Sequence, residues 1–230
     1  MVFKKKYNIW FQLILGLLCG LLNMFGSKLA EGLSLPIFND TLFTVLASFF
    51  GWTAGITSAL GYHILFCLFI QKGFSGFLFV ICSLSMVLIV RLYIKNKETL
   101  SLMDFVFMIF ISALVISFEG GLIFVFAFNQ FDFKETVEVN KITYILLRQQ
   151  IPLLFSSWLS RIPVNLLDKT LAVLAGGYGA IGLGKLFMGG GWRLFFKKKT
   201  ILYLSKIINS FQNTLKVAVC YLCQFCHKLC

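Results

Sequence analysis

Charge is scarce in this chain of 230 residues, because only 13% of them are Asp, Glu, Lys or Arg. Soluble globular domains carry about twice that share. Hydrophobic residues make up 59% of the chain, and long apolar runs recur along most of its length. The strict alternation of apolar and polar residues that a membrane β-barrel requires is absent from the sequence. The composition therefore predicts an all-α polytopic membrane protein.

Catalytic motifs are also absent from the sequence. The two histidines, His63 and His227, belong neither to a Ser-His-Asp set nor to a His-Glu-x-x-His helix. The glycine-rich stretches 176–179 and 189–191 lack the Lys-Ser/Thr ending of a phosphate-binding loop. We therefore expect no ATPase motif, no bound cofactor and no enzymatic activity in this chain.

Positive charge is the exception to this scarcity, since the formal net charge is +12. The basic residues cluster at the ends of apolar runs, at 4–6, 91–97 and 193–199. This placement fits cytoplasmic anchoring of membrane spans better than a groove for nucleic acid. No small-x-small cleavage site follows the first apolar run, so we expect an uncleaved first helix. The expected location is the cytoplasmic membrane of the cell, with both termini in the cytoplasm.

The apolar runs predict six transmembrane helices, at 7–24, 37–50, 53–70, 74–90, 102–128 and 162–188, with an irregular segment at 25–36. A seventh span at 142–160 would place the basic tail opposite the basic N-terminus, against the positive-inside rule. Arg148, Gln149, Gln150 and Pro152 also interrupt that segment. We therefore predict a re-entrant or interfacial outer helix there. Residues 1–192 are expected to form the transmembrane substrate-binding domain, and 193–230 a basic, Cys-rich, amphipathic cytoplasmic tail.

The stretch 33–60 has an unusual polar pattern. Asn39 and Asp40 stand at the head of the second predicted span, and Thr44 belongs to a narrow stripe of polar and small residues along it. The large apolar side chains of this span are expected to face lipid, while the stripe faces protein or a ligand. Those apolar residues are Leu42, Phe43, Leu46, Phe49 and Phe50.

A second polar set lies at the start of the last predicted span. Arg161, Asn165 and Asp168 share one helix face, and Lys169 borders it. With Asn39 and Asp40, these residues would form a polar cluster near the outer side. Such a cluster can hold a small polar molecule, or it can be an ionic lock between spans. The residue types leave both possibilities open.

Glu119 lies within the fifth predicted span, where a charged carboxylate needs a partner. It can contact a ligand, accept a hydrogen bond, or pair with Arg148 or Arg161. Of these possibilities, we favour the ion pair.

Gly16 and Gly20 form a small-xxx-small pair on the first predicted helix, which permits close approach of another helix. That helix can belong to this bundle or to a partner protein. In the tail, four cysteines have the spacing of an iron–sulfur run or a zinc clip: Cys220, Cys223, Cys226 and Cys230. No glycine lies between them to let the chain wrap a metal, so we do not predict a metal site.

Two motifs resemble a known family. The segment from Leu35-Pro-Ile-Phe-Asn-Asp-Thr through Gly51-Trp-Thr-Ala-Gly resembles the second and third helices of substrate-binding S components of energy-coupling factor (ECF) vitamin transporters. Ile162-Pro-Val-Asn-Leu-Leu-Asp-Lys resembles the last helix of that family. Tyr62-His63 stands where the family often has Ser-Asn, and the usual proline is missing after Gly51. Because of these departures, the resemblance does not identify the substrate.

The resemblance implies a six-helix subunit of an ABC importer that captures a vitamin or related micronutrient. A transmembrane coupling subunit and cytoplasmic ATPases would be its partners. The substrate-binding residues would be Asn39, Asp40, Thr44, Glu119, Arg161, Asn165, Asp168 and Lys169. Gly16 and Gly20 would dock the coupling subunit. A membrane receptor that signals ligand occupancy to a partner protein is the alternative, and a small intramembrane enzyme is a third.

Overall fold

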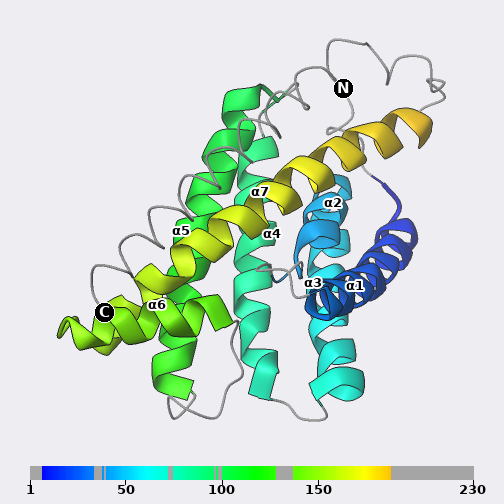
Figure 1. Cartoon of the computed structure of the whole chain (residues 1–230). Coiled ribbons are helices and arrows are strands. Elements are labelled where there is room, and N and C mark those ends of the chain that lie inside the picture. The colour runs from blue at the N-terminus through cyan, green and yellow to red at the C-terminus, as the bar shows by residue number, and fades with distance from the viewer. Residues whose placement is uncertain are drawn as a thin grey trace. The chain divides into compact units, whose positions relative to one another are not determined.

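The computed structural model of this chain is described at residues 7–33, 38, 40–71, 75–95, 97, 100–127 and 137–187. Met1–Leu183 forms one compact unit and Gly184–Cys230 a second. The architecture below is that of the first unit (Figure 1). The four cysteines of the predicted tail lie outside the described residues.

The described part of the chain is helical. Its long helices are α1 (Ile9–Gly32), α3 (Trp52–Phe66), α4 (Val80–Ile94), α5 (Leu102–Ala127) and α7 (Leu153–Phe187). Two short helices, α2 (Leu42–Phe50) and α6 (Val137–Arg148), lie between them in the sequence. A π-helical turn, Cys67–Gln71, extends α3, and a 3₁₀ turn, Ser75–Phe79, precedes α4. Helix α1 continues through most of the segment that was predicted to be irregular at 25–36, so that prediction is wrong as far as Gly32.

Helix α1 packs closely along α3, and the two run in the same direction. A Cβ atom on Gly16 would lie 2.6 Å from the carbonyl oxygen of Ala54, and one on Gly20 would lie 2.9 Å from that of Ser58. Further along the pair, Tyr62 donates a hydrogen bond to Ser27. The small-residue face of α1 is therefore covered by α3 of the same chain. It is not open for docking a coupling subunit, which corrects the role predicted for Gly16 and Gly20.

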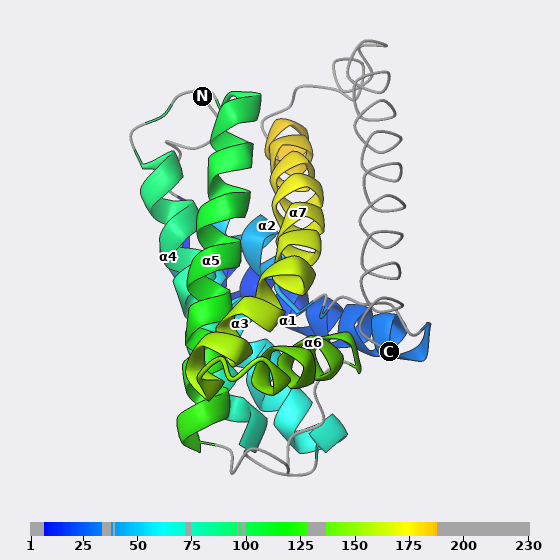
Figure 2. The ribbon, with the colours of Figure 1, turned by 60° about the vertical axis from the view of Figure 1, so that its left-hand side comes forward.

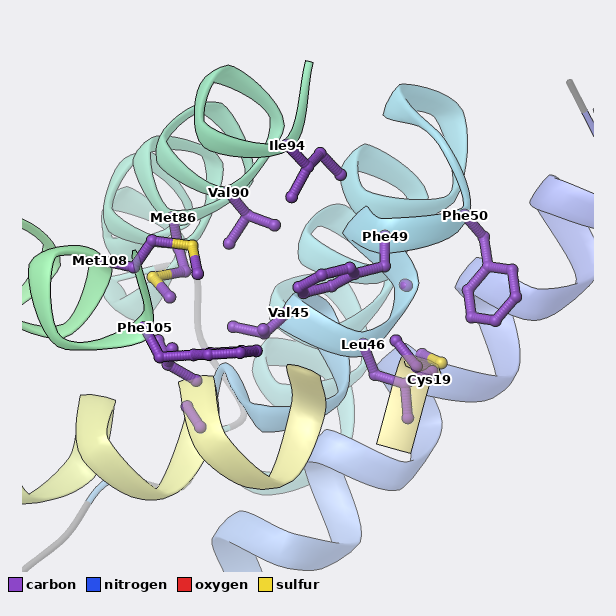
Figure 3. Close-up of a cluster of buried hydrophobic side chains, with 14 of the residues drawn as sticks. Cys19, Val45, Leu46, Phe49, Phe50, Met86, Val90, Ile94, Phe105 and Met108 are labelled. Atoms are coloured by element: carbon purple, nitrogen blue, oxygen red, sulfur yellow. The ribbon is translucent and has the colours of Figure 1, made fainter. Parts of the chain in front are cut away.

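Helix α2 lies in the centre of the core rather than at its edge. Every residue from Thr44 to Phe50 is buried. In Figure 3, Phe49 lies near Val90 and Ile94 of α4, whereas Phe50 points towards α1. The expectation that the large apolar residues of α2 face lipid is wrong for Leu46, Phe49 and Phe50, which are at most 8% exposed. A helix enclosed by protein on all sides need not match the thickness of a membrane.

The remaining helices alternate in direction. Ser85 of α4 meets Glu119 of α5, and Lys97 pairs with Asp104, so these two helices are antiparallel. Helices α5 and α7 are also antiparallel, because Gly121 lies against Trp158 whereas the ring of Phe105 stacks on Tyr178. The views in Figures 1 and 2 show α4 and α5 side by side. The first residues of α1 and the last of α7 consequently point to the same side of the first unit.

The segment predicted as one re-entrant or interfacial helix at 142–160 is divided between two helices. Gln150 adopts a φ of 61°, and the N–H groups of Gln150 and Ile151 donate to the carbonyls of Leu147 and Leu146. This is the hydrogen-bond pattern of a Schellman helix end, and Pro152 follows it directly. Residues from Leu153 onward instead belong to α7, which continues through Pro163.

Five of the described helices are long and apolar enough to cross a membrane: Ile9–Gly32, Trp52–Ile70, Gly76–Ile94, Leu102–Phe126 and Leu153–Gly184. Their outward faces carry exposed large apolar side chains, such as Leu18 on α1, Leu88 on α4 and Phe107 on α5. These features are those of a multi-pass α-helical membrane protein. The predicted second span, at 37–50, is not among the five, because its helix has only nine residues.

Gly16→Ala should destabilise the bundle. The new methyl group would lie 2.6 Å from a backbone oxygen and 2.8 Å from Thr57 Cβ, so α1 and α3 must separate. We expect a cost of about 1–3 kcal/mol, measured as thermal unfolding in detergent. Gly61→Ala in α3 is the matched control, because its Cβ would meet only Leu17 Cδ2 at 3.9 Å. Equal stability of the two variants would contradict this packing.

Candidate functional site

The N-terminus of α2 lies inside the bundle and is held there by Asn23 of α1. Asn23 Oδ1 accepts a hydrogen bond from the backbone N–H of Phe43 at 2.8 Å, and its Nδ2 donates to Thr44 Oγ1 at 2.8 Å. Thr41, the residue before α2, makes no side-chain cap of its own. Asn23 of α1 thus caps the N-terminus of α2, a role that the residue directly before a helix usually has.

Thr44 belongs to this hydrogen-bonded network and is fully buried. Its hydroxyl lies 3.0 Å from Ser58 Oγ of α3, and Ser48 Oγ donates to its carbonyl oxygen at 2.6 Å. The network joins α1, α2 and α3. Thr44 therefore holds the start of α2, and its hydroxyl is already engaged by protein groups.

Lys169 is the centre of a buried ionic cluster next to this helix start. Its Nζ lies 2.6 Å from Asp168 Oδ2, 2.9 Å from Thr41 Oγ1 and 3.3 Å from Asp40 Oδ1. The sequence prediction that Asp40, Asp168 and Lys169 meet is therefore confirmed. We call these three residues and Thr41 the lysine cluster. Lys169 lies 16 residues after Leu153 and 18 before Phe187, so the cluster is at mid-length of α7.

Exposure within the lysine cluster is uneven. The side chains of Lys169 and Asp168 are each 1% exposed, whereas that of Asp40 is 20% exposed. Asp40 belongs to the non-helical segment that leads into α2. Asn39, which was predicted to contribute, lies outside the described residues.

The other predicted site residues each have a separate hydrogen-bond partner. Asn165 Nδ2 donates to Ser117 Oγ of α5 at 2.9 Å. Arg161 donates to the carbonyl oxygen of Ser157 at 2.6 Å and to its hydroxyl, and its guanidinium lies 4.8 Å from the centre of the Phe124 ring. These contacts join α7 to α5.

Glu119 Oε1 accepts a hydrogen bond from Ser85 Oγ at 2.5 Å. The ion pair favoured for Glu119 is not formed with Arg148 or Arg161 among the described residues. The hydrogen-bonded alternative is the one that the structure contains.

Hydrogen bonds link polar side chains of neighbouring helices inside the bundle. Ser85 of α4 donates to Glu119 of α5, and Lys169 of α7 donates to Thr41 at the start of α2. His63 of α3 lies 2.9 Å from Ser83 Oγ of α4. Charged and polar side chains of α2, α4, α5 and α7 thus converge inside an otherwise apolar bundle. Such convergence can hold a small polar molecule or lock the helices.

Sequence reasoning missed Asn23, Thr41 and the serines that hold the predicted residues in place. One signal was present for Asn23, because positions 16, 20 and 23 fall on one helix face. A polar residue on the face with the two glycines is expected to meet the helix that those glycines approach. The serines carry no comparable signal, since serine is common at helix contacts in membranes.

Asn23→Leu should destabilise the fold by about 1–3 kcal/mol, because the N–H of Phe43 would be left buried without an acceptor. Thermal unfolding of the purified protein measures this cost. Asn140→Leu is the control, since Asn140 is exposed on α6. A loss no larger than that of the control would exclude the capping role of Asn23.

Lys169→Met should be more damaging, by roughly 3–5 kcal/mol, because it leaves Asp168 buried beside Asp40 without the ammonium group. Adding Asp168→Asn should recover part of the loss. Lys28→Met is the matched control, because the Lys28–Glu31 pair is exposed and such pairs contribute about 0–1 kcal/mol. Unfolding temperatures in detergent compare the variants, and equal loss for both lysines would refute the ionic lock.

The geometry of the lysine cluster and of its neighbours is the basis for assigning a role to this site. No family model, curated protein or solved structure matches this chain.

Proposed function

We propose that this chain is a substrate-capture subunit that binds a small polar micronutrient within the membrane bundle. The observation that carries the proposal is the helix start inside the bundle. Helix α2 begins beside Asn23, and the two non-helical residues directly before it, Asp40 and Thr41, both contact Lys169. Non-helical backbone at membrane depth is tolerated where it is buried in protein or lines a cavity, and broken helices of this kind form substrate sites in transporters.

The proposed transporter is an importer of the ECF type. Support comes from the resemblance of the α2–α3 and α7 segments to S components, and from the meeting of those segments at the lysine cluster. The chain would deliver its substrate by working with a separate coupling protein and ATPases. The basic residues 91–97 lie on the side of the first unit where α1 begins and α7 ends, which favours a cytoplasmic location for that side.

A membrane receptor is the second candidate function, and one observation favours it. The Gly16 and Gly20 face, which an S component would use for coupling, is covered by α3. A receptor does not need a surface that docks the coupling subunit of a transporter. Both functions share the same ligand site and differ only in the partner protein.

Mass spectrometry of small molecules that co-purify with the detergent-solubilised chain should detect a polar micronutrient. Radiolabelled uptake of that molecule by cells should depend on this chain and on ATP, and pull-down should recover a coupling protein with ATPases. Ligand binding without uptake, together with a different partner, would assign the chain to the receptor class. Absence of both ligand binding and uptake would refute capture altogether.

Uptake should also survive changes on the lipid-facing surface. Leu18→Ala alters a side chain of α1 that is 56% exposed. We expect its uptake rate to stay within about twofold of the wild type, whereas Lys169→Met should abolish uptake. Equal uptake by these two variants would show that the lysine cluster is not on the transport route.

A further inference from the structure

We propose that the ligand of the lysine cluster is a small organic cation, which presents its positive group to Asp40. This inference rests on the proposed capture function and adds the chemical class of the substrate. It comes from counting the hydrogen-bond donors of Lys169 and the acceptor atoms of Asp40.

Lys169 has no donor left for a ligand. An ammonium group has three protons, and three oxygens of Asp168, Thr41 and Asp40 lie within 3.3 Å of its Nζ. Its side chain is 1% exposed. A carboxylate or phosphate on a ligand would therefore have to displace one of these oxygens before it could bind the lysine.

Asp40, in contrast, keeps acceptor capacity. Lys169 holds only Oδ1, at the longest of its three distances, and no described residue donates to Oδ2. The Asp40 side chain is 20% exposed, so it is the accessible carboxylate of the cluster. A carboxylate whose second oxygen is open attracts cations and hydrogen-bond donors and repels anions.

The groups near Asp40 favour the same class of ligand. Two carboxylates, Asp40 and Asp168, face the single ammonium group of Lys169, so the lysine cluster carries one net negative charge. A ligand that brings one positive charge balances the charge of this cluster, whereas an anion adds to it. Arg161 of α7 donates to Ser157 and lies over the Phe124 ring.

Three probes of nearly equal size and shape test the charge preference: choline, its neutral isostere 3,3-dimethylbutan-1-ol, and the anion 3,3-dimethylbutanoate. Each is titrated to millimolar concentration into the purified full chain while thermal unfolding is followed. We expect choline alone to raise the unfolding temperature. Equal stabilisation by the neutral or anionic probe, or none by choline, would overturn the proposal.

Asp40→Asn identifies the residue responsible. The amide oxygen of Asn keeps an acceptor for Lys169, so the fold should persist while the negative charge is lost. Choline should then bind roughly ten- to hundredfold more weakly, because its trimethylammonium group has no N–H and is attracted to Asp40 through charge alone. Glu31→Gln is the matched control, because Glu31 is 71% exposed and pairs with the exposed Lys28. Unchanged binding by Asp40→Asn would overturn the assignment.

The class of any co-purified ligand separates this inference from the proposed function. A cation at neutral pH supports both. An anionic micronutrient that is taken up by cells would leave the capture function standing and refute the cation preference. Choline binding without uptake of any micronutrient would refute capture while the chemistry assigned to Asp40 stands.

Discussion

The hydrogen bond between the Phe43 N–H and Asn23 Oδ1 is the contact on which the rest of this structure depends. A helix that starts at a membrane surface can leave its first N–H groups to water, but a helix that starts inside a bundle cannot. Asn23 is fully buried, and it lies 14 residues after Ile9 in α1. Helix α2 therefore starts within the bundle, with Asp40 and Thr41 directly before it.

The start of α2 inside the bundle brings opposite charges together. Asp40 and Thr41 precede α2 directly, and they meet the middle of α7, where Asp168 and Lys169 lie. Had α2 been a full span, its first residues would stand near the membrane surface, away from Lys169. The glycine face of α1 serves the same arrangement, because close approach of α1 to α3 places Asn23 beside Thr44 and Ser58. Backbone capping, helix packing and charge pairing are thus linked through one short helix.

The sequence was sufficient to predict the all-α membrane class and the meeting of Asp40 with Asp168 and Lys169, because charged residues in apolar surroundings must find partners. It was not sufficient to place α2. Leu46, Phe49 and Phe50 have the composition of a lipid-facing surface, and in a membrane a core facing protein is just as apolar. The same ambiguity affected Gly16 and Gly20, since a small-residue pair permits close approach without specifying which helix approaches. The division at Gln150 depends on a left-handed residue other than glycine, which composition does not reveal.

An ionic lock and a ligand site are compatible in one cluster when its members differ in burial. Asp168 and Lys169 are almost completely enclosed, and breaking their contact would expose two charges to an apolar interior. Asp40 is bound to the same lysine at a longer distance and retains exposure, so its contact can change at a lower cost. The Asp168–Lys169 pair then stabilises the bundle whether or not a ligand is present. The contact of Asp40 with Lys169 is the one that a ligand would change. Because Asp40 precedes α2 and Lys169 belongs to α7, a ligand at Asp40 would act on the contact between these two helices.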